Sequence, residues 1–61
     1  MSSVERIKPG LYKVNGESGM EAGYIQSYKG GWMLHMVSMP KEDFHYLHDA
    51  QVEALKRAER Y

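Results

Sequence analysis

The sequence predicts an α+β fold: a three- or four-stranded antiparallel meander with one C-terminal helix packed on one face. Three observations support this class. A glycine pair at 30–31 separates two strand-like runs, residues 24–29 and 32–37, and glycine supplies the positive φ angles that tight hairpin loops need. Strong helix formers fill residues 50–60. Pro40 separates these two parts, and proline cannot donate a hydrogen bond to a sheet ladder.

Size and composition limit the classes of protein to which the chain can belong. Its 61 residues are expected to form one small domain, residues 1–61, and a chain of this length buries only about 60% of its unfolded surface. Cysteine is absent, which excludes disulfides and thiolate zinc sites. There is no long apolar run and no signal-peptide pattern, so we expect a cytoplasmic protein without a membrane partner. Eight basic residues balance eight acidic ones, whereas nucleic-acid binders usually carry a basic surplus.

The N-terminal third predicts one short strand. Residues 1–9 are polar and end in a Lys-Pro-Gly turn signal, so we expect them to be frayed. Residues 11–14 form the strand candidate, with Tyr12 and Val14 on one side, and a loop follows at 15–19. The central hairpin then covers roughly residues 22–38.

The segment before the C-terminal helix has two interpretations. Residues 44–47 are expected to form a strand, because Phe, His and Tyr favour pleated surfaces. The alternative is that residues 41–48 open a helix. In the favoured interpretation Asp49 is the N-cap of a fresh helix. The helix then carries an apolar stripe that consists of Val52, Ala54, Leu55 and Ala58.

The hairpin register sorts the central side chains onto two faces. A turn at Gly30-Gly31 would pair Tyr28 with Met33 and Gln26 with His35. The side chains that would then face the helix are Ile25, Leu34 and Met36, with Trp32 at the edge. The side chains that would then face away from it are Tyr24, Gln26, Tyr28, Met33, His35 and Val37.

One helix cannot cover both faces, so the second face predicts a contact surface. Tyrosine and methionine are enriched at protein interfaces, and an exposed apolar patch on a small protein usually marks a partner site. The residues expected to bind a partner are Tyr24, Tyr28, Trp32, Met33 and His35. The partner would be another protein, either a larger one or a second copy in a homodimer. A small, neutral, cysteine-free chain of this kind is typical of bacterial or bacteriophage accessory proteins that inhibit, redirect or adapt a larger machine.

Chemical sites are not indicated. His45 and His48 are three residues apart, but a strand at 44–47 would point them to opposite faces, so we expect no metal site. The serines lie outside nucleophile motifs, and there is no phosphate-binding glycine loop. We therefore expect a non-enzymatic protein with no catalytic residues, no cofactor and no small-molecule substrate.

Residues 23–61 also resemble a known DNA-binding class. The run Tyr28-Lys-Gly-Gly-Trp32, followed by a loop, a short strand and a helix with Ala54 and Leu55, resembles the AP2 and integrase arm-binding domains. In those families the sheet enters the major groove and basic strand residues read it, whereas this hairpin carries only Lys29. The resemblance implies an alternative function, nucleic-acid binding through the sheet, helped by the basic helix end of Lys56, Arg57 and Arg60.

Overall fold

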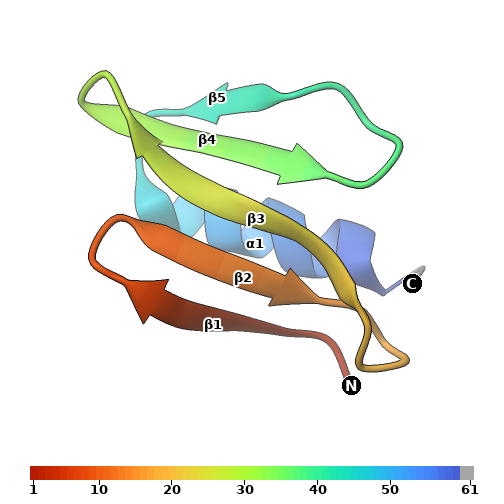
Figure 1. The fold of residues 1–61 in the computed structure, drawn as a ribbon. Coiled ribbons are helices and arrows are strands. Elements are labelled where there is room, and N and C mark those ends of the chain that lie inside the picture. Colours follow the sequence, from red (N-terminus) through yellow and green to blue (C-terminus); the bar gives the residue numbers. More distant parts are fainter. Residues whose placement is uncertain (60–61) are drawn as a thin grey trace.

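The computed structural model describes residues 1–59, which form a five-stranded antiparallel sheet with one helix packed across one face (Figure 1). The strands follow one another in the order β1-β2-β3-β4-β5, so the sheet is a simple meander. The α+β class and the single C-terminal helix are confirmed, and the sheet has five strands rather than three or four. The elements are β1 (Ser3–Lys8), β2 (Leu11–Asn15), β3 (Glu21–Tyr28), β4 (Gly31–Met36), β5 (Glu42–Phe44) and α1 (Leu47–Ala58).

The fraying expected for residues 1–9 is wrong, because most of this segment forms the edge strand β1. Val4 pairs with Val14 of β2 and packs against the buried core. The two strands are joined by a tight turn in which Gly10 adopts φ +83°. The polar character that argued against a strand is what an edge strand needs, because charged edges discourage pairing with other chains.

The central hairpin forms as expected, but its turn lies one residue earlier than predicted. Tyr28 pairs with Gly31, and the two turn residues are Lys29 and Gly30, with φ +48° and +80°. Positive φ at both positions is the hairpin geometry whose twist matches that of the flanking strands. The pairing therefore differs from the predicted one by two residues. Since side chains alternate with a period of two, every side chain within β3 and β4 stays on its predicted face.

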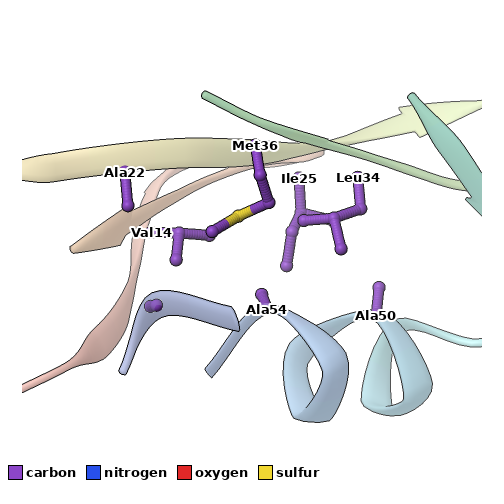
Figure 2. Close-up of a cluster of buried hydrophobic side chains, with 8 residues drawn as sticks. Val14, Ala22, Ile25, Leu34, Met36, Ala50 and Ala54 are labelled. Atoms are coloured by element: carbon purple, nitrogen blue, oxygen red, sulfur yellow. The ribbon is translucent and has the colours of Figure 1, made fainter. Parts of the chain in front are cut away.

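The core lies between the sheet and the helix (Figure 2). Its largest fully buried side chains are Val14, Ile25, Leu34 and Met36. In Figure 2 the side chains of Ile25, Leu34 and Met36 extend from the sheet toward the helix, as the register predicted. Gly23 lets β3 and β4 approach closely here, because a Cβ at this position would lie 2.4 Å from the carbonyl oxygen of His35.

The buried stripe of the helix differs from the predicted one. The helix residues that are fully buried are Ala50, Ala54 and Ala58, whereas Val52 is 51% exposed and Leu55 is only half-buried. Ala50 and Ala54 point at the sheet in Figure 2. Alanine at these positions lets the helix axis come close to the sheet, so the large apolar volume of the core comes from the strands.

The boundary between β5 and α1 corrects two expectations. The last strand is shorter and earlier than 44–47, since it ends at Phe44, and the helix begins at Leu47. Tyr46 is the N-cap and makes no side-chain capping bond, so Asp49 is not the cap. Asp49 lies in the first helical turn, where a carboxylate interacts favourably with the helix dipole.

Arg57 ties the helix to the last strand. Its Nη2 donates to both carboxylate oxygens of Glu42, at 2.7 and 3.2 Å, and its Nε donates to Glu53 at 3.3 Å. The hydrogen bond to Glu42 raises the pKa of Arg57. This side chain is therefore occupied in holding β5 against α1. Arg60, which we expected beside it at the basic helix end, lies outside the described residues.

Candidate protein-contact surface

The sheet face opposite α1, here called the outer face, carries two rows of side chains that cross the strands. They point away from the helix because alternate residues of a strand face opposite sides, and Val14, Ile25 and Leu34 point toward it. The tyrosine row consists of Glu5, Lys13, Tyr24 and His35, each paired with the next. The glutamine row consists of Lys8, Leu11, Gln26, Met33 and Asp43. The helix covers neither row, and Figure 1 shows α1 on the far side of the sheet.

Tyr24 and His35 interact at the centre of the outer face. Their ring centroids are 5.2 Å apart with an interplanar angle of 86°, which is an edge-to-face contact. The Tyr24 hydroxyl lies 3.1 Å from Nδ1 of His35. Both residues are half-buried against their neighbours although no second layer formed by residues 1–59 covers them. The pair therefore forms a preformed aromatic centre that does not depend on a ligand for its shape.

A groove lies beside this centre, over β1, β2 and β3. It has a volume of about 710 Å³. Its lining includes Ile7, Leu11, Lys13, Tyr24 and Gln26. Ile7 is 51% exposed and lies beside the aliphatic Leu11 and the aromatic Tyr24 in this lining. The groove therefore offers aliphatic and aromatic surface with lysine at its border.

The hairpin tip forms a second, smaller recess. Tyr28 is 46% exposed, and the Nζ atom of Lys29 lies 5.2 Å from the centroid of its ring. A recess of about 360 Å³ continues from Tyr28 past Asp43 and Phe44. The outer face thus stays accessible up to the end of the hairpin.

The structure brings together four of the five predicted contact residues and separates the fifth. Tyr24, Tyr28, Met33 and His35 share the outer face. Trp32 lies on the helix side, where it packs against the core and makes an edge-to-face contact with Tyr12 at 5.8 Å.

Sequence reasoning missed the contribution of the N-terminal hairpin to this face. Ile7 and Leu11 extend the apolar surface, and Lys8 and Lys13 supply its positive charge. The alternation in residues 11–14 was a usable signal. Once Tyr12 and Val14 are assigned to the core, Leu11 and Lys13 must face the other way.

The ionisable groups of the described residues form no evident chemical centre. Among residues 1–59 there is no cluster of three or more His, Cys, Asp or Glu side chains that could hold a metal ion. His48 lies 3.9 Å from Asp49, and both side chains are largely exposed. Within the same part of the chain, every buried side-chain nitrogen and oxygen has a hydrogen-bond partner.

No protein-family model, curated protein or solved structure matches this chain. The helix of the described residues, α1, is neither long nor apolar enough to span a membrane.

Proposed function

We propose that this protein is a non-enzymatic accessory protein that binds another protein through its outer face, with a regulatory role. The observation that supports this most is that large side chains occupy both faces of the sheet, although the helix covers only one. On the core side four large residues and four alanines are fully buried, and further large side chains such as Tyr12, Trp32 and Phe44 pack against them. The outer face carries large apolar or aromatic side chains from four strands: Ile7, Leu11, Tyr24, Tyr28, Met33 and His35. Exposed apolar surface of this kind usually marks a protein interface.

Charge favours a protein partner over nucleic acid. On the outer face Lys13 is paired with Glu5, and Asp43 lies at the edge opposite Lys8, so residues 1–59 form no continuous basic surface across this face. Arg57, part of the predicted basic helix end, is held by two carboxylates. Nucleic-acid binding draws much of its affinity from lysine and arginine on phosphates and weakens steeply with salt. Apolar docking between proteins does not depend on phosphate contacts and does not weaken steeply with salt.

Retention of proteins on the immobilised chain tests this function. Gln26→Arg places a bulky cation at the centre of the outer face, at an exposed position where the fold tolerates it. Val52→Arg is the matched control, because it adds the same group to the exposed side of α1. From a nuclease-treated cell extract, we expect wild type and Val52→Arg to retain the same protein and Gln26→Arg to lose it. Equal retention by all three chains would contradict the proposal. A protein that wild type retains from an untreated extract but not from the nuclease-treated one would favour nucleic-acid binding.

A further inference from the structure

We infer that a second copy of this chain covers the outer face in the free protein, so that two sheets stack face to face about a two-fold axis parallel to β3. This inference rests on the proposed function. The same face would serve both contacts, so dimerisation would compete with binding of the partner protein and regulate it.

The strand order makes such a stack geometrically simple. β3 is the central strand of five. A two-fold axis parallel to β3 keeps each residue's position along the strands and exchanges β2 with β4 and β1 with β5. Such an interface is isologous, meaning that each surface patch meets the patch related to it by the symmetry. The outer face is therefore compatible with this dimer only if its β1–β2 half is complementary to its β4–β5 half.

The glutamine row has this complementarity. It begins with Lys8 on β1 and ends with Asp43 on β5, and Leu11 and Met33 flank the central Gln26. When a second copy is laid over it, Lys8 of each chain meets Asp43 of the other and Leu11 meets Met33. Gln26 meets its own copy, and an amide both donates and accepts hydrogen bonds.

Lys8 and Asp43 cannot meet within one chain. They lie on the opposite edge strands, four strand spacings or about 19 Å apart. Stacked sheets twist by about 30°, which displaces these edge positions by roughly 5 Å. The flexible four-carbon stem of lysine spans a displacement of that size. The opposite charges at the two ends of the row can thus meet each other only between chains.

The tyrosine row is compatible with the same arrangement. Tyr24 lies on β3 and meets Tyr24 of the second copy, so the aromatic centres of the two chains stack. Glu5 on β1 lies over the start of β5 in the other chain, where Lys41 directly precedes Glu42. Opposite charges again fall at the border of the interface, and Lys13 of each chain lies over His35 of the other beside the aromatic centre.

The shape and size of the face also fit. The groove lined by Ile7, Leu11 and Tyr24 lies over the β1–β3 half of the sheet, and Met33 projects from the other half. A methionine side chain adapts readily to such a recess. The two longer dimensions of the molecule, 31 and 23 Å, bound a projected face of roughly 700 Å², close to the ~800 Å² per partner of a standard interface.

A charge exchange between chains tests this dimer. Sedimentation equilibrium of wild type should give twice the 7.1 kDa chain mass. Lys8→Glu alone and Asp43→Lys alone should each raise the dissociation constant roughly tenfold or more, because two like-charge contacts form per dimer. A mixture of the two variants should recover wild-type association, because each mixed pair restores both opposite-charge contacts. Lys56→Glu, on the exposed side of α1, is the control and should associate like wild type.

Several results would overturn the inference. These are a wild-type chain that stays monomeric at all accessible concentrations, single variants that associate normally, and a mixture that associates no better than its components. Circular dichroism of each variant confirms that the fold is kept. The outcome is separable from that of the proposed function. A monomeric chain whose partner retention is still lost with Gln26→Arg would refute the dimer alone, whereas a dimer that retains no other protein would refute partner binding alone.

Discussion

The Tyr24 hydroxyl and Nδ1 of His35 lie 3.1 Å apart, and their rings meet edge to face across β3 and β4 on the outer face. The pair links β3 to β4 on the side of the sheet that the helix does not cover. It pairs the Tyr24 hydroxyl with a ring nitrogen of His35 at the centre of a face that carries both apolar and charged side chains.

Tyr24→Phe should destabilise the monomer modestly. The change removes the hydroxyl that bonds His35 and keeps the ring contact, so we expect a loss of about 1 kcal/mol in the free energy of unfolding. Urea denaturation at low protein concentration measures it. Tyr46→Phe is the control, because Tyr46 is 63% exposed and belongs to the N-cap of α1 rather than to a strand. An equal loss in both variants would show that the Tyr24–His35 bond contributes nothing specific.

Leu34→Ala should be among the most damaging substitutions in the chain. Leu34 is fully buried between the sheet and α1, so its truncation removes apolar contacts and leaves a cavity, at a cost of roughly 3 kcal/mol. A domain of this size has little stability to lose, and the variant should melt far below wild type. Val52→Ala removes a half-exposed aliphatic side chain from the same two-layer structure and should change the unfolding free energy by less than about 0.5 kcal/mol. Similar effects of the two changes would contradict the helix orientation described above.

Ala54→Leu tests the close approach of helix and sheet. Ala54 is fully buried and faces the large core residues, so three added heavy atoms would push α1 outward. Overpacking of this kind costs roughly 1–3 kcal/mol. Thermal unfolding followed by circular dichroism should show a lowered melting temperature. A variant as stable as wild type would mean that the helix is packed more loosely than its alanine stripe requires.

The sequence was sufficient to assign the faces of the central sheet because that assignment depends only on parity. Gly30 and Gly31 marked a two-residue turn. Although the turn is formed by Lys29 and Gly30, the pairing differs by two residues and leaves the faces unchanged. The turn position itself was not predictable from propensity, because Gly31 is required by the close approach of β5, which is distant in sequence. A Cβ there would lie 2.7 Å from the carbonyl oxygen of Phe44 on β5.

The errors have a common cause in tertiary context. β1 was missed because an edge strand is stabilised by backbone pairing with β2 and needs few apolar side chains. The helix stripe was misassigned because Val52 and Leu55 are more hydrophobic than the alanines, whereas the sheet requires small residues at the contact. Asp49 is a good N-cap by type, but the N-cap lies three residues earlier, at Tyr46. Trp32 was included in the contact set by residue type although its register places it with the core.

Glu42→Gln should loosen the attachment of β5 to α1. The change removes the carboxylate charge to which Arg57 is hydrogen-bonded. Because the side chains of Glu42 and Arg57 are partly exposed, at 43% and 21%, we expect the free energy of unfolding to fall by about 1 kcal/mol. Glu53→Gln, which affects only the i,i+4 contact at 3.3 Å, should cost less than about 0.5 kcal/mol. Chemical denaturation of wild type and of the two variants measures both losses in the free energy of unfolding.

The pH dependence of the stabilisation by the Glu42–Arg57 pair follows from the direction in which the pKa of Arg57 is shifted. The hydrogen bond to Glu42 raises the pKa of Arg57, so its stabilising contribution is fully present below the ordinary arginine value. It is lost only as the pH rises through the higher, folded-state value. The stability difference between wild type and Glu42→Gln should therefore stay level from about pH 7 to about pH 10. A difference that declines steadily over this range would contradict the assignment of the ion pair.

Photo-crosslinking tests most directly whether the outer face is the surface through which this protein contacts other chains. A benzophenone amino acid replaces Met33 on the outer face in one variant and Val52 on the exposed side of α1 in another. Irradiation of the Met33-substituted protein should give a covalent dimer when pure and adducts with another protein in a nuclease-treated extract, whereas the Val52-substituted protein should give neither. Adducts that form equally from both positions, or only from position 52, would contradict the account.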